Sequence, residues 1–146
     1  MSTDHRALAV ATFNRCWDLL ETASPTVEHH TELLTVAFTS RYHWLEAGEL
    51  QQWILSDWMV ARAAGAAGLG DLAIRFALRA QAGLSPDLPD WLVASVAEGV
   101  ARAYSDAGHE AETIEWVAKA QSLVAAIEGD EDRALIASQL DEVIAR

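Results

Sequence analysis

Histidines beside acidic residues are the first candidates for chemistry in this sequence of 146 residues. His29 and His30 lie near Glu32, and His43 lies three residues before Glu46, so each group offers an imidazole and a carboxylate on one side of a helix. His29 and His43 are separated by roughly 21 Å along a helix, so they cannot share an ion. The spacing also lacks Glu-x-x-His and His-x-x-x-His patterns, and we expect neither a metal site nor a cofactor.

Signatures of catalysis are missing from the rest of the sequence. The glycine-rich run 65–70 follows a predicted helix and lacks the Lys-Ser/Thr ending of a phosphate-binding loop. No Gly-x-Ser-x-Gly elbow occurs. The single cysteine, Cys16, lies near Trp17 and Leu19 on an apolar side of a predicted helix, where a small buried residue is expected rather than a nucleophile. We therefore expect a protein that is not an enzyme.

The composition is acidic, with enough apolar residues for a core. The formal net charge is -12 and 51% of the residues are hydrophobic. This charge argues against nucleic acid and anionic membranes as partners. The absence of a signal-peptide pattern and of an apolar run of about 18 residues predicts a cytoplasmic protein. Residues 87–146 hold 13 acids and 4 bases, so most of the negative charge lies in the C-terminal part.

The elements that position these residues are expected to be helices throughout. Apolar residues recur at spacings of three and four, the prolines fall at boundaries, and sustained two-residue alternation is missing. We expect an all-α fold in which Gly68 ends the third helix and Asp71 caps the fourth. The seven predicted helices span about residues 4–22, 26–47, 49–67, 71–82, 90–107, 110–127 and 130–146.

Part of the sequence repeats with a period of 40 residues. A shift of 40 places Val60–Ala63 on Val100–Ala103 and makes two turn glycines coincide. Nine of 22 positions are identical over the segment that starts at Val60. The same shift places Leu34 on Ile74, which suggests a diverged first copy near the N-terminus.

The repeated pattern resembles a tetratricopeptide repeat. Val100, Ala101, Tyr104, Gly108 and Ala120 occupy positions where this family has a large, a small, an aromatic, a turn and a small residue. The run 40–44 and the Ala-Arg-Ala-x-x-x-x-Ala-Gly block also make the chain similar to bacterial tetratricopeptide-like proteins.

The resemblance implies one domain over residues 1–146, a short right-handed array of antiparallel helical hairpins. The hairpins would span about 4–47, 49–82 and 88–127, and a capping helix would span 130–146.

In this family the first helices of successive repeats line a concave groove. The resemblance therefore implies a protein or peptide partner, held by eight groove residues: Arg15, Asp18, Leu55, Trp58, Arg62, Ser95, Glu98 and Arg102. Arg62 and Arg102 are equivalent across the repeat, and two guanidinium groups in one groove suit a carboxylate or an acidic peptide. The alternative is that both arginines pair with neighbouring acids such as Asp57 or Asp106.

Two other functions stay open. A small-molecule or metal-binding helical domain would use a pocket formed by Arg41, Tyr42, His43 and Trp44. A self-associating structural module, such as a homodimer, would use the alanine-rich faces. Four tryptophans lie on predicted apolar faces and are expected in the core: Trp17, Trp53, Trp91 and Trp116. A partly exposed Trp58 would instead serve as a binding anchor.

Overall fold

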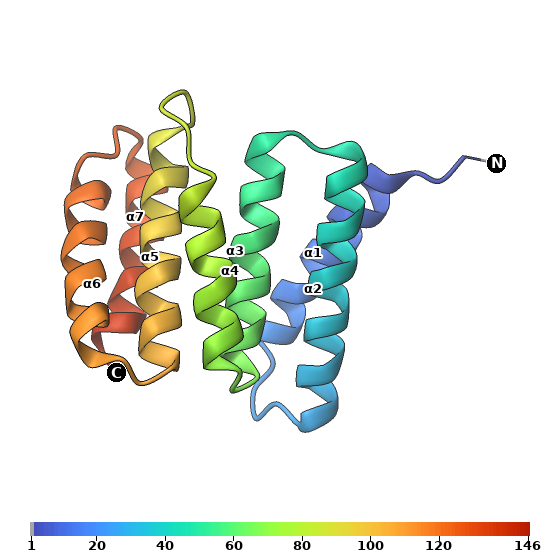
Figure 1. Cartoon of the computed structure of the whole chain (residues 1–146), viewed down its shortest axis with the longest axis horizontal. Coiled ribbons are helices and arrows are strands. Elements are labelled where there is room, and N and C mark those ends of the chain that lie inside the picture. Colours follow the sequence, from blue (N-terminus) through green and yellow to red (C-terminus); the bar gives the residue numbers. More distant parts are fainter. Residues whose placement is uncertain (1) are drawn as a thin grey trace.

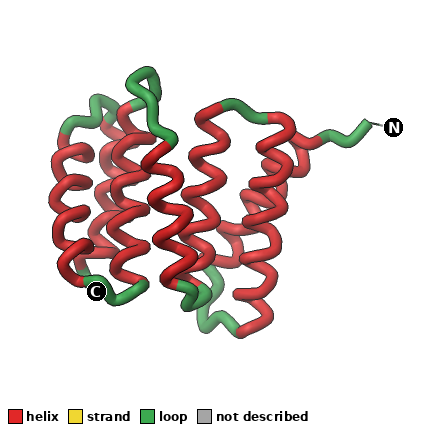
Figure 2. Tube along the Cα trace, in the orientation of Figure 1, coloured by secondary structure: helices red, strands yellow, loops and turns green. Residues whose placement is uncertain are grey.

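Seven α-helices make up the described part of the chain, residues 2–146, in a computed structural model (Figure 1). They are α1 (His5–Leu20), α2 (Val27–Ala47), α3 (Leu50–Ala66), α4 (Gly70–Ala82), α5 (Asp90–Asp106), α6 (Glu110–Ala125) and α7 (Asp130–Ile144). No strand occurs in residues 2–146 (Figure 2). No helix of that range is both long and apolar enough to cross a bilayer. The predicted all-α class and the seven helices are confirmed.

The first two helices begin at capping residues. The Asp4 side chain accepts a hydrogen bond from the Ala7 N–H, at 3.0 Å. Thr26 and His29 form a capping box, in which each side chain bonds the other residue's backbone. The prediction that Asp71 caps α4 is wrong: the cap position is Leu69, and Asp71 lies in the first turn, where its charge still favours the helix dipole.

Glycines with positive φ follow α3 and α5. The φ angles are +81° at Gly68 and +78° at Gly108, in the left-handed region that glycine enters without steric penalty. The backbone N–H of Gly68 bonds the Gly65 carbonyl, and that of Gly108 bonds the Ser105 carbonyl, so each glycine satisfies an open carbonyl of the last turn. The expected end of the third helix at Gly68 is confirmed.

The helices stack as three hairpins followed by a single helix. Each helix packs against the next one along the chain, and each odd-numbered helix also packs against the next odd-numbered helix. The odd-numbered helices α1, α3, α5 and α7 therefore form a continuous row (Figure 1). We call this row the inner row. It brings together side chains that lie about 40 residues apart in the sequence.

Helix α5 lies at the centre of the C-terminal half. It contacts α3, α4, α6 and α7, and every residue from Ala94 to Ala103 is buried. Small side chains permit this close approach. A Cβ atom added to Gly99 would lie 2.7 Å from Cδ1 of Trp58, so α3 and α5 meet at van der Waals contact there.

The tryptophans do not all follow the predicted pattern. Trp17, Trp91 and Trp116 are half-buried and pack against the core clusters. Trp53 is 40% exposed, so its expected place in the core is wrong. Its indole N–H bonds the Trp44 carbonyl at 3.0 Å, which holds the ring against the end of α2 on one side only. Trp58 is buried and is not an exposed anchor.

Two loop glycines allow a matched test of the left-handed turn. Gly108→Ser should lower the free energy of unfolding by about 1 kcal/mol, because serine is strained at positive φ. Gly129 has a φ of -73° and occupies the cap position of α7, where serine is favourable, so Gly129→Ser should leave stability unchanged or higher. Urea unfolding followed by circular dichroism measures both. Equal losses in the two variants would contradict this assignment of the turn.

Candidate functional site

Three charged residues form a ladder across the inner row. Arg62 lies on α3, Arg102 on α5 and Glu142 on α7, at intervals of 40 residues. Oε2 of Glu142 lies 3.0 Å from Nη2 of Arg102 and 3.5 Å from Nη2 of Arg62. One carboxylate oxygen therefore contacts both guanidinium groups, and we call these three residues the ladder.

A buried carboxylate holds Arg102, the middle residue of the ladder, in place. Glu98 accepts a hydrogen bond from Nε of Arg102 at 2.8 Å, and its side chain is fully buried. Nη2 of Arg102 also donates to the Gln139 carbonyl of α7, at 2.9 Å. Charge-assisted bonds of this kind fix a guanidinium in one orientation. Arg102 therefore joins α5 to α7 by contacting both a backbone carbonyl, that of Gln139, and a side-chain carboxylate, that of Glu142.

Two indole rings lie against Arg62, the ladder residue on α3. The Arg62 guanidinium lies 5.3 Å from the Trp17 ring centroid and 5.8 Å from that of Trp58, within the range of cation–π attraction. The Trp58 N–H donates to the Ser95 carbonyl at 3.1 Å, which fixes that ring. Burial lowers the pKa of Arg62, and nearby Arg102 acts in the same direction. The charged form of Arg62 is thus held at some electrostatic cost.

The cluster has unused hydrogen-bonding capacity. Nη1 of Arg62 and Oε2 of Glu98 are buried and make no hydrogen bond within residues 2–146. Most buried polar atoms in proteins have a partner, because an unpaired one loses the hydrogen bonds that it made to water. One donor nitrogen and one acceptor oxygen of this cluster therefore lack a partner within residues 2–146.

The structure brings together five of the eight predicted groove residues: Trp58, Arg62, Ser95, Glu98 and Arg102. They do not form an open groove, because all of them except Arg62 are buried and the Arg62 side chain is only 13% exposed. The packing of α3 and α7 around α5 covers them.

The remaining three predicted groove residues lie apart from this cluster. Arg15 is exposed and pairs with Glu32 of α2, with a distance of 2.7 Å between Nε and Oε2. Asp18 is exposed, and half-buried Leu55 packs on the core between α3 and α5. These positions follow from the angle at which each helix lies in the row, which a repeat alignment does not contain.

The acids that pair with Arg62 and Arg102 are not the suggested Asp57 and Asp106. Asp57 pairs with Arg41 at 2.8 Å and with Arg79 at 3.4 Å, and Asp106 pairs with Arg146 at 2.6 Å. Glu98 and Glu142 are the acids that pair with the two arginines, in place of the suggested Asp57 and Asp106. A second shift of 40 from Arg102 reaches Glu142, so the repeat contained a signal for this residue.

The second candidate pocket does not assemble. Arg41 bonds Asp57 and lies over the Phe76 ring at 5.5 Å, while Trp44 is buried beneath Arg6 at 5.3 Å. His43 shares a hydrogen bond of 2.8 Å with His5, from Nδ1 to Nδ1, and Tyr42 is exposed. The rings of Tyr42 and His43 lie together against His5, with their own centroids 5.2 Å apart, whereas Arg41 and Trp44 contact other neighbours. The four side chains of residues 41–44 therefore do not converge on one point.

No group of three or more His, Cys, Asp or Glu side chains in residues 2–146 is close enough to hold a metal ion. Cys16 is buried, and desolvation raises the pKa of its thiol to about 12. The thiol is therefore protonated at neutral pH, the form that is a poor nucleophile.

No family model, curated protein or solved structure matches this chain. The tetratricopeptide resemblance stays a prediction from the repeat.

Replacing Arg102, the middle residue of the ladder, tests its structural role. Arg102→Ala should lower the free energy of unfolding by about 3–5 kcal/mol, because Glu98 is left buried without its counter-charge. Replacing both charges, with Glu98→Leu and Arg102→Met, should recover most of that loss. Arg15→Ala, which breaks the exposed pair with Glu32, should unfold close to the wild type. Urea unfolding measures all three, and a double variant as unstable as Arg102→Ala would contradict the role of the buried charge.

Proposed function

We propose that this protein is a non-catalytic, tetratricopeptide-like binding module that recognises an acidic segment of a partner protein. The ladder would hold a carboxylate of that segment between Arg62 and Arg102. Guanidinium groups suit this task because their N–H donors match the two oxygens of a carboxylate. The proposed role is binding alone, because the charged groups of the ladder are paired with one another and carry no nucleophile.

The observation that carries this proposal is the position of Glu142. Its carboxylate bridges Arg62 and Arg102, yet its side chain is 57% exposed. Because the Arg62 and Arg102 side chains are only 13% and 7% exposed, a carboxylate from solvent would reach their guanidinium groups by displacing Glu142. In this arrangement α7 supplies an internal copy of the ligand, and the partner's carboxylate would replace it.

The exchange of one carboxylate for another should require little free energy. The incoming carboxylate would form the same two ion pairs that Glu142 gives up, so the charge balance around Arg62 and Arg102 is kept. Arg62 and Arg102 keep their orientation during the exchange, because indole rings hold one and Glu98 holds the other. The binding groups are thus arranged before the ligand arrives, which reduces the entropy lost on binding.

Selection from a random peptide library, with the full chain as bait, tests the proposal. The selected peptides should be rich in Asp and Glu. Arg62→Gln should bind them at least about tenfold more weakly, equal to 1.4 kcal/mol, because one of two guanidinium groups is lost. Glu142→Gln should bind them more tightly, because the internal competitor is removed.

Asp141→Asn serves as the matched control. Asp141 is exposed on the same helix, next to Glu142, and it makes no ion pair within residues 2–146. It should bind the selected peptides as the wild type does. Peptides without acidic enrichment, or unchanged binding by Arg62→Gln with a wild-type circular dichroism spectrum, would refute the proposal.

Self-association is the second candidate function, and one observation favours it. Phe38, Tyr42 and Leu45 are exposed at spacings of four and three on one face of α2. An apolar face of this kind is typical of contact surfaces. Sedimentation equilibrium should then show a dimer that Tyr42→Glu dissociates, whereas a wild-type chain that is monomeric at high concentration would exclude this role.

A further inference from the structure

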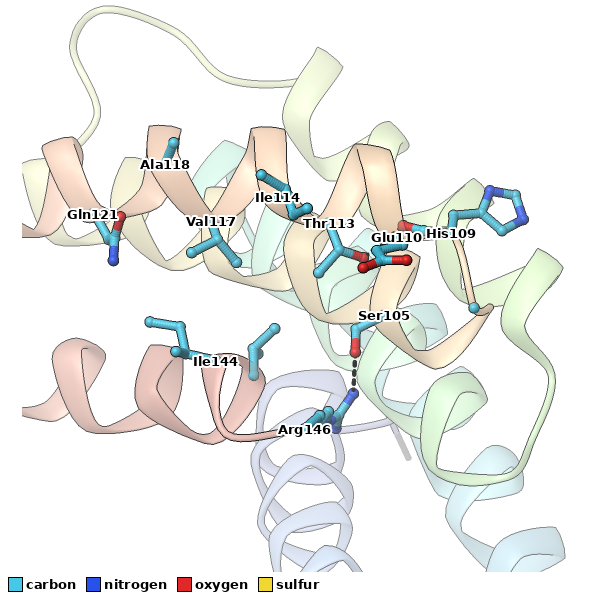
Figure 3. A pocket seen from close by; sticks show the side chains of 12 residues that line it. Ser105, His109, Glu110, Thr113, Ile114, Val117, Ala118, Gln121, Ile144 and Arg146 are labelled. Atoms are coloured by element: carbon cyan, nitrogen blue, oxygen red, sulfur yellow. Dashed lines mark hydrogen bonds between the residues drawn. The ribbon is translucent and has the colours of Figure 1, made fainter.

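A groove runs between α6 and α7 at the C-terminal end of the array (Figure 3). Its two sections have volumes of about 570 Å³ and 430 Å³, and both are lined by Gln121 and Ile144, so they adjoin. Val117 of α6 and Ile144 of α7 face one another across the first section (Figure 3). Ile114 and Val143 complete its apolar walls.

The 40-residue repeat shows what covers the equivalent positions elsewhere in the array. Leu34, Ile74 and Ile114 are equivalent residues on α2, α4 and α6. Leu34 and Ile74 are half-buried and pack against the cluster formed by α3, α4 and α5. Ile114 is 65% exposed. The same position is therefore covered in the first two hairpins and open in the third.

We call the line of contact between an even-numbered helix and the next odd-numbered helix a seam. At the α2–α3 and α4–α5 seams, an aromatic residue of the following even-numbered helix packs against the core. Phe76 of α4 packs against the core cluster of α1, α2 and α3. Trp116 of α6, its equivalent, packs against the cluster of α3, α4 and α5. Both aromatic residues are accompanied by small residues, with Ala77 and Ala120 among them. The α6–α7 groove is the next seam in this series, and a helix with the same pattern fits it.

The charge around the groove indicates the charge of its occupant. Three acids contribute to its lining: Glu110, Asp130 and Asp141. The two arginines of the lining are already paired, Arg133 with Asp130 and Arg146 with Asp106. Asp130 is neutralised by Arg133, so Glu110 and Asp141 are the lining acids without a cationic partner within residues 2–146. Their negative charge attracts basic side chains and repels a second copy of the same face.

We propose that the α6–α7 groove binds an amphipathic helix of a partner protein, which inserts one aromatic residue flanked by small residues and carries basic side chains at its edges. Such a helix repeats the contacts that α4 and α6 make within the array and adds charge complementarity. None of the three ladder residues lines the groove, so this proposal does not depend on the proposed recognition of carboxylates.

The sequence of α4 supplies the probe. A helix-stabilised peptide of residues 70–82 presents Phe76 with small neighbours, and its two arginines outnumber its single aspartate. Fluorescence anisotropy should show that the labelled peptide binds the full chain saturably. A peptide with Phe76→Ser should bind at least about tenfold more weakly, because the aromatic anchor is lost.

Two variants of the full chain locate the binding site. Ile114→Lys should weaken binding of the α4 peptide at least about tenfold, because it places a cation on the apolar wall. Leu135→Lys is the matched control, since Leu135 is 58% exposed on α7 but does not line the groove, and it should bind normally. Methyl NMR signals of Ile144 should shift when the peptide binds to the wild type.

Three results would overturn the proposal. The first is an absence of saturable binding at any soluble concentration of the α4 peptide. The second is an equal loss in Ile114→Lys and Leu135→Lys, both with wild-type circular dichroism spectra. The third is self-association of the wild type that Ile114→Lys abolishes, which would assign the groove to a second copy of this chain.

Discussion

Burial of α5 on all sides is the constraint on which the rest of the structure depends. Four helices surround it, and small residues such as Gly99 allow their backbones to approach. Two charged residues, Glu98 and Arg102, lie within this buried segment. A buried charge is tolerated when it is paired and hydrogen-bonded, so the position of each neighbouring helix is tied to the satisfaction of this pair.

The pairing of Arg102 links this packing requirement to the proposed function. Arg102 uses one set of donors to neutralise Glu98 and another to hold the Gln139 carbonyl and the Glu142 carboxylate of α7. The same guanidinium therefore stabilises the end of the array and contributes to the surface where we propose a carboxylate binds. A site built in this way is rigid, because its donors are already fixed by the core.

The 40-residue repeat produces both proposed binding surfaces, the ladder and the α6–α7 groove. Residues at intervals of 40 lie side by side on successive odd-numbered helices, which places Arg62, Arg102 and Glu142 in one row. The even-numbered helices repeat in the same way, since α4 and α6 each pack an aromatic residue against the core cluster of the three preceding helices. The C-terminal seam lies in the part of the chain, residues 87–146, that holds 13 acids and 4 bases.

The sequence alone was sufficient to predict the helices and their order, because helical spacing, capping residues and turn glycines such as Gly68 act locally. It also identified Arg62 and Arg102 as equivalent, since a repeat is visible without a structure. That Glu98 and Glu142 neutralise these arginines, and that Trp53 lies at the surface, became evident only from the packing of the helices. Pairing and exposure depend on the angles and distances between helices far apart in the sequence, and these arise from the packing of side chains of different size, which periodicity does not encode.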